Sequence, residues 1–197
     1  MKFLFDLGGI FFDWSPKYFF DKIFTDKNEL NFFLTKVCNE EWNIKQDAGR
    51  KIQDAEYELI TQFPNYKEQI KLYYSNHHNM IRGVFQESID LLIELKSKKF
   101  QSYVLSNWSA ETFKGMTENY PFLKLFDGML ISGEYKLIKP DPSIYKLAIK
   151  LFNIIPEETV FIDDKKENIE AANDLNFITI HITNPNKIKD KIKKYFN

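Results

Sequence analysis

Acidic, hydroxyl, amide and lysine side chains stand beside short apolar segments at several separate places along the sequence. In chain order they are Asp6, Ser106, Asn107, Ser132, Lys139, Asp163 and Asp164. Carboxylates of this kind can act as nucleophiles or hold a hard divalent cation, and a lysine beside them offsets their charge. Each residue alone is a weak signal, because acidic residues often end strands or cap helices. Their chemistry depends on whether the fold brings them together.

The elements around these residues alternate between strand and helix. Apolar residues at helical spacing predict one helix over 87–99, with Ile89, Leu92 and Ile93 on its apolar face, and another that contains Phe113 and Met116. Short apolar runs predict strands at 2–6, 101–106, 128–132, 159–163 and 177–182. Strands without polar alternation are typical of a parallel sheet covered on both faces. The expected fold class is therefore α/β, a Rossmann-like doubly wound parallel sheet of five or more strands.

A helical block interrupts this sheet domain just after its first strand. From residue 16 to 86 the apolar period is helical, and no convincing strand is visible. We therefore expect an α/β core domain formed by residues 1–15 and 84–197, with a helical unit of residues 16–83 inserted into it. The two linkers are expected near Trp14–Pro16 and Arg82–Val84.

The predicted sheet would gather the reactive side chains at one edge. Open parallel sheets bind ligands at the carboxyl ends of their strands. Asp6, Ser106 and Asp163 close three of the predicted strands, and Lys139 follows another after a short loop. Their joint placement at strand ends is much harder to explain by chance than any one of them. We expect a polar site at this edge.

Composition and charge exclude several classes of protein. The 197 residues include 27 basic and 28 acidic side chains, whereas a nucleic-acid-binding protein usually carries a basic surplus. No run approaches the roughly 20 apolar residues of a membrane span, and Asp6 and Asp13 interrupt the apolar segment near the N-terminus. The one cysteine, Cys38, fits a reducing compartment. We expect a soluble, cytoplasmic protein that binds neither nucleic acid nor membrane.

Four ordered motifs resemble those of the haloacid dehalogenase (HAD)-like hydrolase superfamily over essentially the whole chain. FDLGGIFFDW carries Asp6, VLSNWS carries Ser106, KPDPSIY carries Lys139, and FIDDKKENIEAA carries Asp163, Asp164 and Asn168. The inserted helical block lies where this family has its type 1 helical cap. Because DLGG, SNWSAETF and KPDP occur together, the chain is most similar to the phosphatase-like branch.

The resemblance implies a Mg²⁺ site and a nucleophile. Asp6 would attack the phosphoryl group and form an aspartyl-phosphate, which divides one difficult hydrolysis into two easier steps. Mg²⁺ prefers oxygen ligands, so the resemblance implies Asp6, Asp164 and the Gly8 carbonyl as metal ligands, with Asp163 nearby as a ligand, an outer residue or a helix cap.

The resemblance also implies a phosphate-binding set. Ser106 and the Asn107 amide would hold phosphoryl oxygens, and Lys139 would offset the charge of the carboxylates and the phosphate. Asn168 replaces the Asp that is common at the end of the fourth motif, and it would support the site from behind.

One position departs from the family pattern. Most phosphatases of the superfamily carry a second Asp two residues after the nucleophile, as general acid and base, and this chain has Gly8 there. Glycine cannot move a proton, so protonation of the leaving group must come from water, the substrate or another side chain. Among side chains, the candidates are Asp13 and the histidines of the helical block, His77 and His78. The main hypothesis is a Mg²⁺-dependent phosphatase for a small phosphorylated metabolite. One alternative is a weakly active or inactive relative that binds a phosphorylated ligand. The other is a 2-haloacid dehalogenase, a branch that lacks the acidic pair found here.

Overall fold

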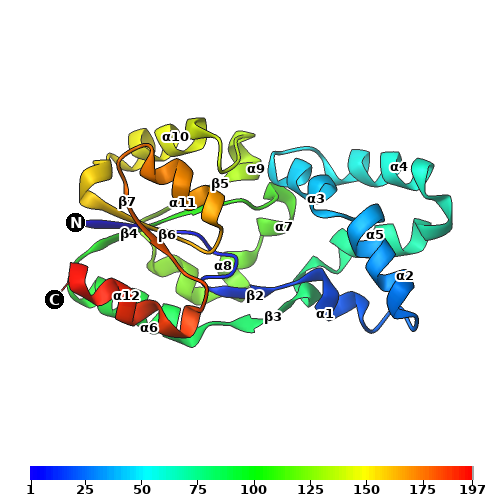
Figure 1. The fold of residues 1–197 in the computed structure, drawn as a ribbon, viewed down its shortest axis with the longest axis horizontal. Helices are drawn as coiled ribbons and strands as arrows, with labels where there is room; N and C mark the ends of the chain where they lie inside the picture. Colours follow the sequence, from blue (N-terminus) through cyan, green and yellow to red (C-terminus); the bar gives the residue numbers. More distant parts are fainter. Residues whose placement is uncertain (197) are drawn as a thin grey trace.

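Five short apolar segments form the central parallel sheet of the protein. The computed structural model describes residues 1–196, and its sheet has the spatial order β5-β4-β1-β6-β7 (Figure 1). The strands are β1 (Lys2–Phe5), β4 (Gln101–Ser106), β5 (Gly128–Ile131), β6 (Thr159–Asp163) and β7 (Ile178–His181). All pairs are parallel, and Phe5 of β1 lies between Val104 and Ile162. This confirms the expected α/β class.

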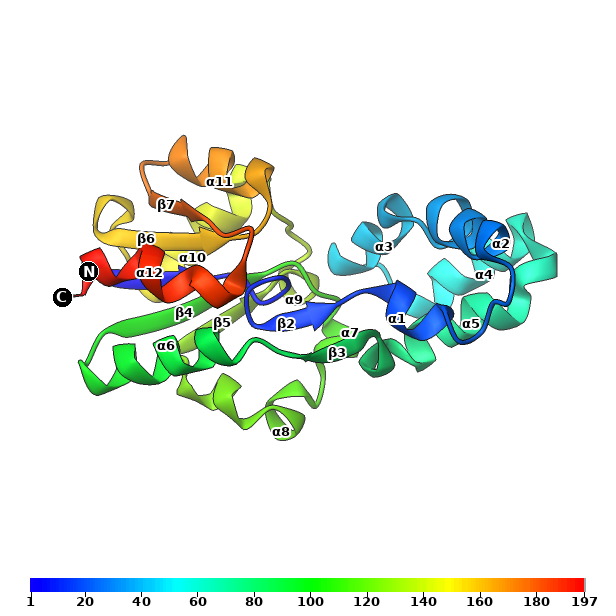
Figure 2. The same cartoon turned by 60° about the horizontal axis from the view of Figure 1, so that its bottom comes forward.

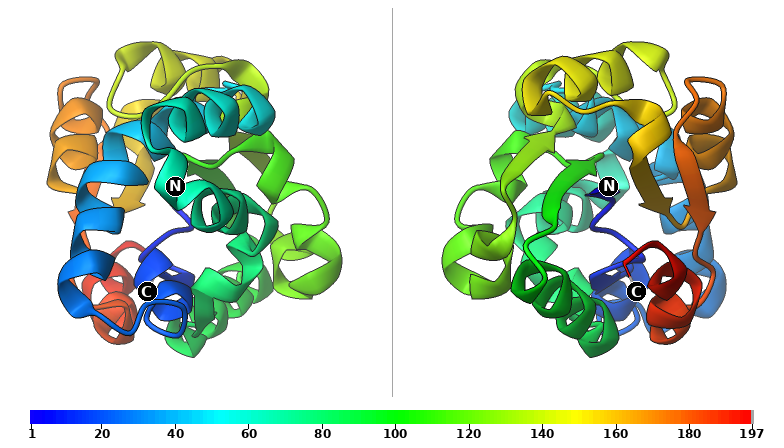
Figure 3. Two further views of the ribbon diagram at one scale, coloured as in Figure 1. Left: turned by 90° about the vertical axis from the view of Figure 1, so that its right-hand side faces the viewer. Right: turned by 90° about the vertical axis from the view of Figure 1, so that its left-hand side faces the viewer.

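Helices cover both faces of the sheet, which explains why its strands lack polar alternation (Figure 3). The covering helices are α6 (Gln86–Ser97), α10 (Pro142–Phe152), α11 (Lys166–Asn173) and α12 (Ile188–Ile192). Successive side chains of a strand point to opposite faces. Phe3 and Phe5 therefore join the core that includes Leu91 and Ile188, whereas Leu4 joins the other core with Ile144.

The apolar face predicted for α6 is partly wrong. Leu91, Leu92 and Leu95 are fully buried against the sheet, whereas Ile93 is 51% exposed. The helix carries apolar residues over more than half of its circumference, so periodicity alone permits two orientations. The sheet selects the orientation that buries three leucines.

Two strands connect the sheet domain to the inserted helices. β2 (Phe12–Trp14) and β3 (Ile81–Val84) pair as an antiparallel ribbon, with Asp13 opposite Gly83 (Figure 2). The expectation of no strand between residues 16 and 86 is therefore wrong at β3. The two segments are short and lie far apart in the sequence, so the local pattern carries no sign of their pairing.

The inserted helices extend from the sheet domain and have a hydrophobic cluster of their own (Figure 1). They are α1 (Pro16–Phe20), α2 (Lys27–Phe32), α3 (Glu40–Asp47), α4 (Ile52–Gln62) and α5 (Lys67–Ser75), and we call residues 16–80 the helical insertion. Phe20, Phe33 and Tyr73 are fully or almost fully buried at its centre. This part of the chain therefore packs largely on itself.

Short helices complete the edge of the sheet that faces the insertion. They are α7 (Ala110–Phe113), α8 (Met116–Asn119) and α9 (Ser132–Tyr135). The single helix expected around Phe113 and Met116 is divided, because Gly115 between them has a φ of +85°. No helix among residues 1–196 is both long and apolar enough to cross a membrane.

Candidate active site

The ends of β1 and β4 bring Asp6 and Ser106 together. Ser106 ends β4, Asp6 follows β1, and the Ser106 hydroxyl donates a hydrogen bond of 2.7 Å to Asp6 Oδ1. Lys139 Nζ lies 3.0 Å from the same oxygen. Burial raises the pKa of Asp6, and Lys139 and Ser106 act against that rise. The side chain is thus a nearly buried carboxylate held by two donors.

Lys139 is the cation of the site. Its side chain is only 1% exposed and reaches Asp163 Oδ2 at 2.6 Å as well as Asp6. Burial lowers its pKa, but the two carboxylates outweigh that effect, so the pKa is raised and the lysine stays charged. The Asn107 side chain fixes the Lys139 backbone, since it accepts from Lys139 N at 2.8 Å and donates to Lys139 O at 2.9 Å.

Asp163 turns toward the interior of the protein. Its Oδ1 accepts from Lys165 N at 2.8 Å and from Asn168 Nδ2 at 3.0 Å. Its Oδ2 accepts from Lys139 Nζ and from the same Asn168 amide at 3.1 Å. Both oxygens of this fully buried carboxylate are therefore already occupied, and Asp163 positions Lys139.

Asp164 turns the other way, into a cavity. One oxygen from each of Asp6, Asp163 and Asp164 lies within 4.8 Å of the others, a spacing that suits a divalent cation. Burial raises the pKa of Asp164 to about 7, with Asp6 and Asp163 adding to the rise. Three carboxylates face one lysine here, so the group has surplus negative charge. Hard oxygen donors of this kind are the ligands that Mg²⁺ prefers.

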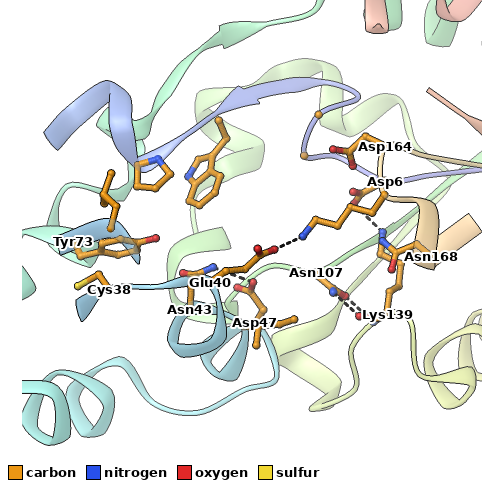
Figure 4. Close-up of a pocket in the computed structure, with 17 residues that line it drawn as sticks. Asp6, Cys38, Glu40, Asn43, Asp47, Tyr73, Asn107, Lys139, Asp164 and Asn168 are labelled. Atoms are coloured by element: carbon orange, nitrogen blue, oxygen red, sulfur yellow. Dashed lines mark hydrogen bonds and ion pairs between the residues drawn. The ribbon is translucent and has the colours of Figure 1, made fainter. Parts of the chain in front are cut away.

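A cavity of about 450 Å³ separates this carboxylate group from the helical insertion (Figure 4). At the sheet side it is lined by Asp6, Gly8, Gly9, Asn107, Lys139, Asp164, Lys165 and Asn168. At the other side it is lined by Trp14, Pro16, Leu34, Cys38, Glu40, Asn43, Ile44, Asp47 and Tyr73. The sheet side is thus polar and charged, whereas much of the opposite wall is apolar.

Three polar contacts join the insertion to the sheet edge. The Ser132 hydroxyl donates to the main-chain oxygen of Asp47 at 2.6 Å, and Ile52 N donates to Glu111 Oε1 at 2.9 Å. Lys165 forms an ion pair with Glu40 across the cavity (Figure 4). Both ends of α3 and the start of α4 are therefore in contact with the core.

The structure brings most of the sequence-predicted residues together at one edge. Gly8 lines the cavity, and Asn168 lies behind Asp163. Asp13 is a wrong candidate for proton transfer, because Arg82 (2.6 Å) and the Tyr18 hydroxyl (2.7 Å) occupy its carboxylate outside the cavity.

Several lining residues were missed by sequence reasoning. Asp47 and Tyr73 occur outside the four motifs, Trp14 is the last residue of the first motif, and nothing in their local pattern marks them as lining residues. Of the two histidines proposed, His77 lines a small cavity beside Gly8, and both line a separate hollow.

Comparisons with known proteins find a family model and several relatives that match this chain. A family model described as haloacid dehalogenase-like hydrolase matches residues 18–182. The sesquiterpene phosphatase astK of Aspergillus oryzae is 27% identical over 180 residues, which cover 91% of this chain and 88% of that protein. A phosphorylated carbohydrates phosphatase of Thermotoga maritima is 23% identical over 86% of this chain and 78% of its own length. A HAD family enzyme of Bacteroides thetaiotaomicron, solved with magnesium and inorganic phosphate, superposes with a TM-score of 0.69 at 25% identity, covering 91% of this chain and 92% of that one.

Proposed function

We propose that this chain, which belongs to the haloacid dehalogenase-like hydrolases, is a Mg²⁺-dependent phosphomonoester hydrolase. It would act on a small phosphorylated metabolite through an aspartyl-phosphate at Asp6. The observation that carries the proposal is the position of Asp6 beneath the cavity, with Ser106 2.7 Å and Lys139 3.0 Å from one carboxylate oxygen. A carboxylate nucleophile flanked by a hydroxyl and a fixed cation suits phosphoryl transfer, which depends mainly on positioning and charge neutralisation.

The residues present fit a magnesium ion. Asp6, Asp164 and the Gly8 carbonyl would hold it, while Asp163 stays engaged with Lys139 and Asn168. A bound Mg²⁺ would offset negative charge on the phosphoryl oxygens. The surplus of carboxylates and the raised pKa of Asp164 support this assignment.

The other side chains of the site are assigned their roles by the hydrogen bonds that they can still make to a substrate. An Asp6 oxygen attacks phosphorus and the ester oxygen leaves, after which water attacks the same phosphorus and releases Asp6. Ser106 can turn its hydroxyl to a phosphoryl oxygen, and Lys139 balances the added charge. The Asn107 side chain is engaged with the Lys139 backbone, so its main-chain N–H is the amide we assign to phosphate.

We further propose that residues 16–83 act as a cap over residues 1–15 and 84–197. The helical insertion forms the roof of the cavity, and closing such a roof excludes water from the reaction. Its apolar wall, including Leu34, Ile44 and Tyr73, favours an ester whose leaving group has an apolar part. The indole N–H of Trp14 is buried there without a hydrogen-bond partner among the described residues, and a substrate oxygen could accept from it.

A panel of phosphate esters tests the function, assayed with and without Mg²⁺. Wild type should release phosphate in the presence of Mg²⁺, and Asp6→Asn should not. Asp174→Asn, which replaces an exposed carboxyl beyond the site, is the matched control and should keep full activity. If the panel yields no hydrolysis but phosphate still binds, the alternative of an inactive ligand-binding relative replaces this proposal.

A further inference from the structure

The backbone at Gly8 leaves room for a side chain. Among the described residues, no atom outside the neighbouring ones lies within 4 Å of the position that a Cβ of residue 8 would take. A small cavity of about 80 Å³ lies there, lined by Gly8, Trp14, Asn43, Asp47, His77, Asn107 and Trp108. The place where a proton-transferring side chain would normally stand is therefore open, and other residues border it.

Asp47 and His77 are the side chains of this lining that exchange protons most readily. Asp47 also lines the large cavity that contains Asp6, whereas His77 does not. Figure 4 shows Asp47 on α3 with Asn43 and Glu40, facing Asp6 and Asn107 across the cavity. Asp47 thus borders both the cavity that contains the nucleophile and the vacant position at Gly8.

The structure holds Asp47 firmly in this place. Its main-chain oxygen accepts from the Ser132 hydroxyl at 2.6 Å, and that hydroxyl in turn accepts from Trp108 N at 2.9 Å. Its Oδ2 accepts from Asn43 Nδ2 at 3.3 Å. These contacts tie a residue of the insertion to the ends of β5 and β4, so its carboxyl group keeps a fixed position relative to Asp6.

The electrostatic setting of Asp47 suits proton transfer in both directions. Burial raises its pKa to about 7, the Ser109 backbone and Lys165 lower it, and the charge of Asp6 raises it. A pKa near the working pH serves both a general acid and a general base. His77 differs, because burial lowers its pKa to about 4, and it packs against the rings of Trp14 and Trp108.

Charged groups face Asp47 from several elements. They are Asp6 and Lys139 at the sheet edge, Asp164 and Lys165 before α11, Glu40 on its own helix and His77 after α5. Lys165 is engaged with Glu40. The charges that act most on the pKa of Asp47 are those of Lys165, which lowers it, and of Asp6, which raises it.

We propose that Asp47 is the general acid and base of the reaction, supplying from the helical insertion the function that Gly8 cannot. This inference rests on the proposed phosphatase function. In the first step Asp6 attacks phosphorus, the bond to the ester oxygen breaks, and that oxygen takes the proton of the Asp47 carboxyl group. In the second step the Asp47 carboxylate removes a proton from water, the water oxygen bonds to phosphorus, and the bond to Asp6 breaks. Asp6 is then a free carboxylate, and Asp47 is protonated again.

The test compares two esters and three variants in the presence of Mg²⁺. Benzyl phosphate releases a basic alkoxide that needs a proton, whereas p-nitrophenyl phosphate does not. Asp47→Asn should lower kcat/KM for benzyl phosphate by about 10²–10⁴-fold and for p-nitrophenyl phosphate much less. Glu41→Gln, an exposed acid on the same helix, is the control and should change neither. Asp47→Asn/Gly8→Asp should recover most of the benzyl phosphate activity, because residue 8 has room for the new side chain.

Two further readouts separate a chemical role from a structural one. With p-nitrophenyl phosphate, Asp47→Asn should show a burst of nitrophenol equal to the enzyme concentration, since the aspartyl-phosphate lacks its base. The pH dependence of kcat/KM for benzyl phosphate should lose the step near pH 7 that Asp47 produces in wild type. Equal losses on both esters, with no burst and no recovery by Gly8→Asp, would overturn the role of Asp47. If wild type itself hydrolyses neither ester, or if Asp6→Asn remains active, the proposed function fails and this inference with it.

Discussion

Gly9 lies directly against Asp164. A Cβ on Gly9 would stand 2.4 Å from Asp164 Oδ2, closer than any real contact allows, and Gly9 has a φ of +65°. Glycine therefore lets the turn after β1 approach the carboxylate that we assign to the metal. The turn and the acidic pair, far apart in sequence, depend on each other for their shape.

Gly9→Ala should consequently weaken both folding and Mg²⁺ binding. The left-handed backbone costs about 1–2 kcal/mol for a residue with a Cβ, and the methyl group must also displace Asp164. Gly115→Ala is a matched control, because Gly115 has a φ of +85° but open space around its Cβ position. Both variants should lose stability in urea, and only Gly9→Ala should lose Mg²⁺ affinity by calorimetry. Equal affinities in the two variants would contradict the contact as a determinant of the metal site.

Asp164→Asn should lower Mg²⁺ affinity by at least the roughly 10–100-fold that is typical even of substitutions behind the ligands. In wild type, the binding should also depend on pH. Burial and neighbouring carboxylates raise the pKa of Asp164 to about 7, so a proton competes with the metal below that pH. The apparent affinity should therefore fall about tenfold per pH unit as the pH drops below 7. Calorimetric titrations at pH 6 and pH 8 measure this, and an affinity independent of pH would argue against Asp164 as a ligand.

Lys139→Met should destabilise the protein by about 3–5 kcal/mol near neutral pH, because Asp6 and Asp163 would remain buried without their cation. The loss should be smaller in acid. Burial already raises the folded-state pKa of Asp6, and losing the lysine, which acts against that rise, raises it further. A carboxyl whose pKa is higher in the folded state than in the unfolded state costs stability at high pH and less as protonation neutralises it. Urea unfolding at pH 7.5 and pH 5.5 tests this against Lys146→Met, an exposed lysine on α10. A deficit that grows toward acid pH would refute this account.

Leu34→Gln should reduce the preference for apolar leaving groups. Leu34 lines the apolar wall of the cavity, and losing its contact with a substrate ring should cost about 1–2 kcal/mol, or roughly tenfold in kcat/KM. The comparison is between 1-naphthyl phosphate, which should suffer, and ethyl phosphate, which should not. Leu151→Gln replaces a leucine that is 47% exposed on α10 and should leave both unchanged. A uniform loss on both esters would point to altered folding instead of an apolar subsite.

Much of the fold could be predicted because its signals are local. The five sheet strands are short apolar runs, and each strand end is marked by a polar residue, so the convergence of Asp6, Ser106 and Asp163 follows from parallel topology alone. The start of a helix can also be predicted from a capping residue. At the start of α10 the Asp141 side chain accepts a hydrogen bond of 2.7 Å from Ser143 N.

The directions in which the Asp163 and Asp164 side chains point were decided only by tertiary structure. The two residues are chemically identical and adjacent, and the family resemblance favoured Asp164 as a metal ligand but left the role of Asp163 open. At the end of β6 successive side chains point in opposite directions, which sends Asp163 inward to Lys139 and Asn168 and Asp164 outward to the cavity.

The position of Asp47 depended still more on the fold. No motif or period marks this residue, and its place beside the site comes from the docking of α3 on Ser132, 85 residues further along the chain. The pairing of β2 with β3, which connects the insertion to the sheet, could not be predicted from the sequence for the same reason. The spacing of apolar residues and the ends of strands depend on neighbouring residues, so they can be predicted from the sequence. A contact between distant segments forms only once both segments have folded and packed against each other.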